Sequence, residues 1–291
     1  MYEIYSDETG HERFRGIGSI SGHRDNIAEL RRELSQILTD HAVTSVEWKN
    51  ITGDSKKEKA AIAMAHAVIN YAHKLKTRVD ILLWDCLDSR HTIARIDHIM
   101  NLEYIYYKLL RWVKQQWLHG GEEWCFYPDE HTGINWESII EVIENTDLHK
   151  KKDFAPELFD IFPKKRFIRV QDHAQVISEK EPLVQAIDLF SGLHRFSREN
   201  GDLIFTEIFG EQDQHTFFEP IADPEKISRG NRSKITVFHK VYKACSDKSM
   251  YISFKERRYL WSRKKEKNMN FWFYEPMGEL DKAPKKGGPS A

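Results

Sequence analysis

The chain has 291 residues, 40% of them hydrophobic and 31% charged, which is the composition of a globular protein with one large domain or two modest ones. No apolar run approaches the roughly 18 residues of a membrane span, the N-terminus lacks a signal-peptide pattern and the three cysteines lack CxxC spacing, so we expect a cytoplasmic protein with no membrane partner. The formal net charge of −1 hides an asymmetry, because residues 225–267 hold fourteen Lys and Arg against four Asp and Glu, a local charge of +10.

The first part of the chain predicts a hairpin followed by two helices. Two short apolar runs, at 2–6 and 14–20, flank a polar turn. Apolar residues at helical spacing then predict a helix over 25–38. An extended segment, SVEWK at 45–49, follows, and an Ala- and Lys-rich stretch predicts a helix over 56–76.

Helices and strands alternate after this hairpin. The predicted elements are a buried strand at 79–85, a long amphipathic helix at 94–118, a strand at 122–130, a helix at 134–144, a strand at 165–171 and a final helix at 181–200. This order predicts an α/β fold with a mixed sheet flanked by helices. We expect a main domain over 1–200, a basic C-terminal extension over 201–277 and a disordered tail over 278–291.

Acidic residues end two of the predicted strands. The first strand is expected to end at Asp7, with Glu8 and Gly10 completing the turn, and Asp129 and Glu130 end the strand at 122–130. Functional sites in open α/β sheets lie where strands end, because the sheet holds the loops there rigidly. Each pair taken alone fits an ordinary turn equally well, since Asp bonds its own backbone in turns.

A further acid lies inside the final helix. Gln185, Asp188, Gly192 and Arg195 recur three or four residues apart and form one stripe of that helix. A helix loses roughly 1 kcal/mol when Ala is replaced by Gly, so we expect another group to approach closely at Gly192. Taken alone, Asp188 could cap a neighbouring loop or pair with Arg195.

Glu47 is the fourth candidate acid, and it shares a face with Lys49 if SVEWK is extended. The two could also form a surface ion pair that contributes little. Carboxylates brought together repel unless a hard divalent cation lies among them, and oxygen-only ligation favours Mg²⁺ or Mn²⁺ over Zn²⁺. The fourteen histidines show no zinc-ligand spacing, and His131, close behind Asp129, is the one candidate for a general acid or a water-positioning group.

The order of four motifs, YSDETG, VEWK, FYPDE and SEKEPLVQAIDLFSGLHR, resembles the prokaryotic domain-of-unknown-function family numbered 3800. That family is similar in predicted fold to the ribonuclease-H-like nucleases. The resemblance covers residues 1 to about 198, and its most specific part is QAIDLFSG, which resembles the family's QxxDxxxG helix. This chain has SEKE where the family more often has an Asp-Ser-Lys run, and its C-terminal third carries no catalytic motif.

The resemblance implies a ribonuclease-H-like fold with a site for two metal ions. By position, Asp7 would bridge both ions, Asp129 and Asp188 would each hold one, and Glu47 would complete the set. Two such Mg²⁺ or Mn²⁺ ions would activate a water and stabilise the leaving oxygen of a phosphodiester. The residues expected to surround these ligands and to orient them or the phosphate are Glu8, Lys49, Glu130, His131 and Gln185.

The basic C-terminal segment suggests a nucleic-acid partner. Its Lys and Arg would neutralise phosphates while its aromatic residues stack on bases. The residues we expect to do so are Arg257, Arg258, Arg263, Lys264 and Lys265. The same pattern also fits a solvated face whose aromatic residues fill a small core.

The sequence thus predicts a divalent-metal-dependent nuclease. The alternative is a catalytically degenerate module that binds nucleic acid or a protein partner in a defence or toxin-type system. A third possibility is a nucleotide substrate, which an enclosed pocket of ~300 to 1,000 Å³ would favour.

Overall fold

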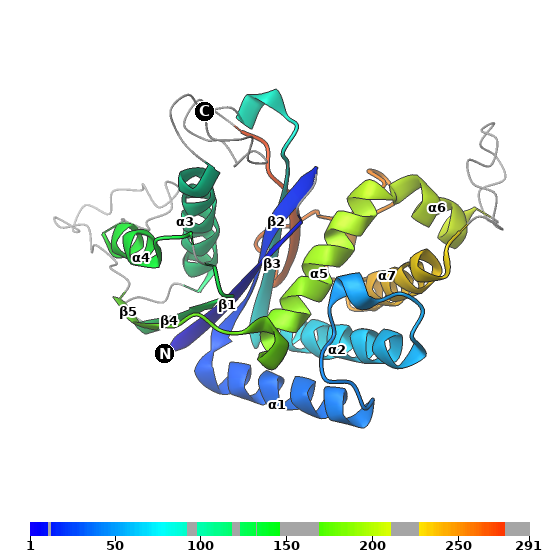
Figure 1. Cartoon of the computed structure of the whole chain (residues 1–291), viewed down its shortest axis with the longest axis horizontal. Helices are drawn as coiled ribbons and strands as arrows, with labels where there is room; N and C mark the ends of the chain where they lie inside the picture. Colours follow the sequence, from blue (N-terminus) through cyan, green and yellow to red (C-terminus); the bar gives the residue numbers. More distant parts are fainter. Residues whose placement is uncertain are drawn as a thin grey trace, which may run out of the picture.

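A computed structural model gives the fold and describes residues 1–10, 13–91, 98–117, 123–131, 133–145, 169–210 and 227–276. The described residues form a six-stranded mixed sheet with the strand order β5-β4-β1-β2-β3-β8 (Figure 1). Its strands are β1 (Tyr2–Thr9), β2 (Phe14–His23), β3 (Thr77–Asp85), β4 (Glu123–Pro128), β5 (Arg169–His173) and β8 (Met269–Phe273). A separate short ribbon pairs β6 (Ile252–Ser253) with β7 (Trp261–Ser262).

Strand β1 lies between β4 and β2 in the sheet. Strands β1, β2 and β3 form an antiparallel meander, which confirms the predicted N-terminal hairpin. Strand β4 pairs with β1 in parallel, and β5 pairs with β4 in the same way. The ends of β1 and β4 therefore meet at one edge, where the Asp129 amide donates to the Ser6 carbonyl at 2.8 Å.

Helices cover both faces of the sheet, as the α/β prediction required (Figure 1). On one face lie α3 (His98–Gln116) and α4 (Trp136–Glu144), and on the other lie α1 (Arg24–Asp40), α2 (Ser55–His73), α5 (Pro182–Glu199) and α7 (Arg229–Asp247). Helix α6 (Gly201–Phe209) follows α5 directly. The sheet separates two hydrophobic cores, and the alternating residues of the fully buried β3, such as Ile81 and Leu82, belong to different cores. None of the described helices is long and apolar enough to cross a membrane, and all three cysteines are buried free thiols.

The segment after residue 200 contributes to this same sheet. Strand β8 pairs with β3 in parallel, and α7 packs against α2. These contacts join the predicted main domain, 1–200, to the predicted extension, 201–277. The division of the chain at residue 200 stays a prediction. The tail at 278–291 lies outside the described residues, as do 92–97 and 165–168, where two predicted elements begin.

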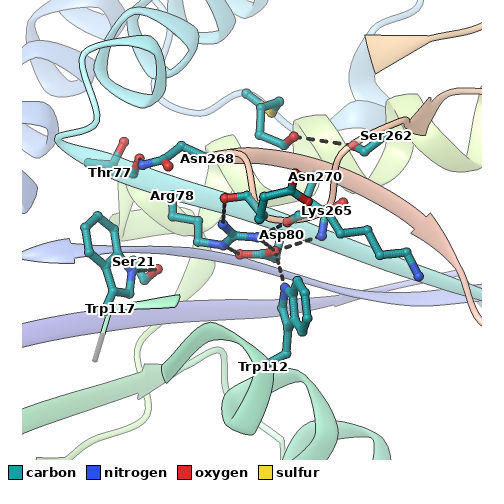
Figure 2. Close-up of polar contacts among 12 residues, drawn as sticks. Ser21, Thr77, Arg78, Asp80, Trp112, Trp117, Ser262, Lys265, Asn268 and Asn270 are labelled. Carbon is teal, nitrogen blue, oxygen red and sulfur yellow. Dashed lines mark hydrogen bonds and ion pairs between the residues drawn. The ribbon is translucent and has the colours of Figure 1, made fainter. Parts of the chain in front are cut away.

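A buried ion pair joins the C-terminal strand to β3 (Figure 2). Asp80 is fully buried and receives two hydrogen bonds from the Arg78 guanidinium, at 2.6 and 2.8 Å. The Trp112 indole and the Asn270 amide also donate to Asp80, at 3.1 and 3.0 Å. Arg78 in turn donates to the Lys265 carbonyl at 2.6 Å, so the pair ties the chain before β8 to the centre of the molecule.

Two local predictions need correction. We expected the first strand to end at Asp7, with Glu8 already in the turn, yet β1 continues through Glu8 and Thr9, which pair with Ile17 and Gly16. The turn begins later, at Gly10, whose φ of +87° suits glycine. The SVEWK segment is extended only as far as Glu47, because Trp48–Asn50 form a short 3₁₀ turn, η1.

Candidate active site

A cavity of about 470 Å³ lies where β1 and β4 end beside α5. Every residue that the sequence predicted for the site, apart from the basic C-terminal residues, lines this one cavity. These residues are Asp7, Glu8, Glu47, Lys49, Asp129, Glu130, His131, Gln185 and Asp188. The structure thus brings together segments that are up to 180 residues apart in the chain.

The extended β1 assigns its two acids to opposite faces of the sheet, because side chains alternate along a strand. Asp7 points toward α5, where the charges of Asp188 and Asp129 act on it. Glu8 points toward α3, where its carboxylate contacts the hydroxyl of Tyr106. The two neighbours therefore have different surroundings, which a turn at Asp7 would not have produced.

Asp7 is the most strongly perturbed acid of the cavity. Burial, followed by the negative charges of Asp188, Asp129 and Glu8, raises its pKa well above the usual value of an aspartate. Burial also raises the pKa of Asp129, whose carboxylate hydrogen-bonds to Asp7 and accepts from the Ser178 amide at 3.1 Å. In the absence of a cation, this geometry favours a proton held between Asp7 and Asp129.

Asp188 approaches the same cavity from α5. Burial raises its pKa, while the hydrogen bond from the Trp48 amide to Oδ2, at 2.7 Å, acts in the opposite direction. Gly192, one turn further on, makes this contact possible. A Cβ at that position would lie 2.5 Å from Cδ1 of Trp48 and closer still to two other atoms of that side chain. The close approach expected at Gly192 is therefore confirmed, and it is the segment carrying Glu47 that approaches.

Gln185 holds two loops in place. Its side-chain oxygen accepts from the Val46 amide at 3.1 Å, and its side-chain nitrogen donates to the carbonyls of Ser178 and Glu179 at 3.2 and 3.0 Å. Both ends of this buried amide are thus used by the protein backbone. Gln185 positions the loops beside Glu47 and Asp129 rather than pointing a free group at a phosphate.

Glu47 and Lys49 form the surface-facing part of the cavity. The Lys49 ammonium lies 2.7 Å from Glu47 Oε2, and this hydrogen bond raises the pKa of Lys49. Glu47 is the less exposed partner, and its charge contributes to the raised pKa of Asp188. The alternative reading of these two residues as an ion pair is therefore realised in the structure, within the cavity lining.

A second group of side chains lies around Glu8, on the α3 side. His131 Nε2 is 3.9 Å from Glu8 Oε1, and Arg15 Nη2 is 3.4 Å from Glu8 Oε2. Burial raises the pKa of Glu8, although the positive charges of His131 and Arg15 oppose that shift. Glu8 therefore lies beside an arginine, a histidine and a hydroxyl, whereas Asp7 lies among carboxylates.

Sequence reasoning missed several residues of the lining. Arg15 and Tyr106 come from β2 and α3, whose motifs carried no signal of a site, and Ser178 contributes only its backbone amide. Arg195 was noticed only as a partner for Asp188. It also lies near Lys234 of α7, whose pKa is lowered by burial and then by the charge of Arg195.

The donor atoms of the acidic side suit a hard cation, because Asp7, Glu47, Asp129 and Asp188 offer only oxygen. In the described part of the chain, however, no three His, Cys, Asp or Glu side chains stand in an arrangement that could hold a metal ion. The hydrogen bonds to Trp48 and Ser178 and the contact between Asp7 and Asp129 occupy several of the oxygens. A bound cation would have to replace the proton between the two aspartates.

The basic C-terminal residues lie apart from the acidic cavity. Arg257 and Arg258 line a second cavity, whereas Arg263 pairs with Glu256. The remaining lysines lie over aromatic rings, Lys264 over Tyr251 at 4.3 Å and Lys265 over Trp272 at 5.3 Å. Aromatic residues of this segment also fill the core, as Phe254 and Phe271 do. Core filling is thus shown for this segment, and its contact with nucleic acid stays a prediction.

Comparison with known proteins found two relatives of similar length in Methanothermobacter thermautotrophicus. They carry the names "Uncharacterized protein ORF2'" and "Uncharacterized protein ORF2". The chain is 31% identical to the first over 292 residues and 32% identical to the second over 294 residues, and each match covers 96% of both proteins. No family model matches the chain, so the resemblance to the domain family numbered 3800 stays a prediction.

Proposed function

We propose that this chain, which belongs to the family of the ORF2' and ORF2 proteins of Methanothermobacter thermautotrophicus, hydrolyses phosphodiesters as a divalent-metal-dependent nuclease. One observation carries the proposal. Asp7, Asp129 and Asp188 come from three distant parts of the chain and line one cavity, where burial raises the pKa of each. Gathering carboxylates in this way costs folding free energy unless a ligand compensates their charge.

The positions of the acids support a ribonuclease-H-like assignment. The resemblance requires one Asp on the first strand, one acid at the fourth strand and one acid on the last helix of the domain. Asp7 lies on β1, Asp129 directly follows β4 and Asp188 lies on α5, the helix after β5. The three acids thus lie on the elements that the resemblance implies, which supports assigning each of them the metal-ligand role expected at its position.

The residues that would hold Mg²⁺ or Mn²⁺ are Asp7, Asp129 and Asp188, with Glu47 at the cavity wall. Bound divalent ions supply activation of a water and stabilisation of the charge that develops on the leaving oxygen. The raised pKa of Asp7 and the oxygen-only donor set fit such a ligand. Since the described side chains do not already form a metal-holding group, the carboxylates must turn toward the cation on binding.

The side chains around these acids can bind and orient the substrate. In hydrolysis, a water oxygen bonds to phosphorus, one P–O ester bond breaks, a water proton leaves with a base and the leaving oxygen gains a proton. Arg195 and Lys49 border the acids and can bind phosphate oxygens. His131, held near Glu8, is placed to position the water or to protonate the leaving oxygen.

Cleavage assays test the proposal. The chain is incubated with labelled single-stranded DNA, double-stranded DNA, RNA and a hybrid, each with Mg²⁺, Mn²⁺ or EDTA. We expect metal-dependent cutting that Asp7→Asn and Asp188→Asn reduce by roughly 100-fold or more, because even residues that only orient metal ligands contribute 10- to 100-fold. Asp40→Asn, at an exposed position at the end of α1, serves as the matched control and should cut normally. Cutting by folded Asp7→Asn at the parent rate contradicts the proposal.

A degenerate module that binds without cutting is the second candidate. The lack of a ready-made metal-holding group among the described residues favours it. Calorimetric titration with Mn²⁺ separates the two functions, since the nuclease should bind the ion and Asp7→Asn should not. The second candidate is supported if the protein binds an oligonucleotide, binds no metal ion and produces no cleavage product.

A further inference from the structure

A second cavity, of about 400 Å³, lies where α5 passes into α6. Its lining contains three arginines, Arg198 from α5 and Arg257 and Arg258 from the turn between β6 and β7. Glu199 and Asp202 also line it, so the guanidinium groups outnumber the carboxylates. Arginine forks of this kind match the paired oxygens of a phosphate.

Aromatic rings contact these arginines. Arg198 lies over Tyr259 at 4.4 Å, and Arg257 lies over Trp261 at 4.2 Å. Arg258 lies 4.0 Å from Asp202, whose side chain is exposed. Within the described part of the chain, Nε of Arg198 and Nη1 of Arg258 are buried without a hydrogen-bond partner. Stacking fixes a guanidinium while leaving its N–H groups available for an anion.

The turn that carries Arg257 and Arg258 is fixed against α5 and α6. The Leu260 amide donates to Ser197 Oγ on α5 at 3.0 Å. Gly201, the first residue of α6, packs so closely against the turn that a Cβ there would collide with the Arg258 carbonyl. Arg258 itself has a φ of +58°, a left-handed conformation that is strained for a residue with a side chain. The cavity is therefore a built feature with a strained residue at its wall.

Residues of helix α5 line both cavities. Arg195 lines the acidic cavity, and Arg198, about one turn later, lines the arginine cavity. Lys234 of α7 lies beside this path, 5.7 Å from the ring of Trp48. Ten residues separate Asp188 from Arg198, which corresponds to about 15 Å along a helix. Cations therefore follow α5 from the acids to the second cavity.

We infer that the arginine cavity binds a backbone phosphate of a polynucleotide whose scissile phosphodiester lies in the acidic cavity. The inference rests on the proposed function, because it takes the acidic cavity as the cleavage site. At the duplex rise of about 3.4 Å per nucleotide of one strand, a separation of about 15 Å corresponds to about four nucleotide steps, and an extended single strand covers it in fewer. A mononucleotide, which the acidic cavity could hold by volume, cannot reach both sites.

Binding of labelled oligonucleotides tests the inference without requiring cleavage. Full-length Asp7→Asn protein in EDTA is titrated with single strands of two, four, six, eight and twelve nucleotides, and fluorescence anisotropy gives Kd at several salt concentrations. We expect Kd to fall by about tenfold between two and six nucleotides. The substitutions Arg198→Gln and Arg257→Gln, added together to the Asp7→Asn protein, should raise Kd for the twelve-nucleotide strand by about tenfold. They should also lower the slope of log Kd against log salt by about two.

Two further variants separate charge from fold. Arg32→Gln/Lys74→Gln removes the same charge from α1 and the end of α2, which line neither cavity, and should change Kd less than twofold. Arg198→Lys/Arg257→Lys keeps the charge and should restore the salt slope. Equal Kd values and equal slopes in the parent and a folded Arg198→Gln/Arg257→Gln variant overturn the inference, as does a Kd that does not change with length.

The outcome is separable from that of the nuclease proposal. If the arginines govern binding but wild-type protein cuts nothing, the inference stands and the proposed hydrolysis fails. If wild-type protein cuts and the arginine variants bind unchanged, the inference alone is overturned.

Discussion

Gly192→Ala tests the contact on which the position of Asp188 depends. In an unobstructed helix, replacing Gly by Ala stabilises the protein by roughly 1 kcal/mol. Here the new Cβ would lie 2.5 Å from Cδ1 of Trp48, a side chain that is 2% exposed and packs in the core. Overpacking of a core costs about 1–3 kcal/mol. The net change should therefore lie between about zero and a 2 kcal/mol loss in the free energy of unfolding.

Gly230→Ala provides the matched control, because it lies on α7 and a Cβ there would be 3.5 Å from its nearest neighbour, Thr52 Cα. This substitution should raise the free energy of unfolding by up to about 1 kcal/mol. Urea unfolding of the three proteins measures both changes. Hydrogen exchange adds a local readout. Displacing Trp48 should break the hydrogen bond from the Trp48 backbone amide to Asp188 and speed hydrogen exchange of that amide. A Gly192→Ala protein stabilised as much as Gly230→Ala would refute the packing argument.

Two further predictions concern buried charge. Asp7→Asn should raise the free energy of unfolding at pH 7 in EDTA, because burial and neighbouring carboxylates raise the pKa of Asp7 in the folded chain. The folded chain then keeps a proton that the unfolded chain releases, so the parent protein loses stability as pH rises above about 3.8. In urea unfolding at a series of pH values, the greater stability of the variant should therefore disappear below that pH. A constant difference between variant and parent at all pH values would contradict this. Asp80→Asn should cost about 3–5 kcal/mol, because it leaves Arg78 buried without its counter-charge. Asp88→Asn removes a partner from the more exposed Arg90 and should cost far less in the same urea assay; equal losses would refute the role of burial.

The regular elements could be predicted from the sequence because their patterns are local. The helical spacing around Leu30 and Leu34 gives α1, and the continuous apolar run of β3 is buried on both faces as expected. Nine residues that line the acidic cavity were also predictable, since strand-end acids and the stripe containing Asp188 occur in an order that resembles a known family. Arg15 and Tyr106 of the same lining were not, because no local pattern marks them.

The rest depends on contacts between distant segments. Strand β8 joins the sheet beside β3, almost two hundred residues earlier, and no local feature of MNFWF names that partner. The early stop predicted for β1 came from the turn preference of Asp, which pairing with β2 overrides. Arg198 gave no signal at all, because its role in the second cavity depends on a turn sixty residues away.

The strand alternation that separates Asp7 from Glu8 gives the two faces of β1 different electrostatic surroundings. Glu8 has Arg15 Nη2 at 3.4 Å and the Tyr106 hydroxyl beside it, and both oppose the rise in its pKa that burial causes. The charges that act on Asp7 are those of carboxylates, and they add to the effect of its burial. The paired strand fixes the face from which each side chain projects, so Asp7 and Glu8 stay on opposite sides of the sheet. The uncompensated charge therefore remains on the α5 side, and a ligand that relieves it there must be positive, either as a proton or as a metal ion.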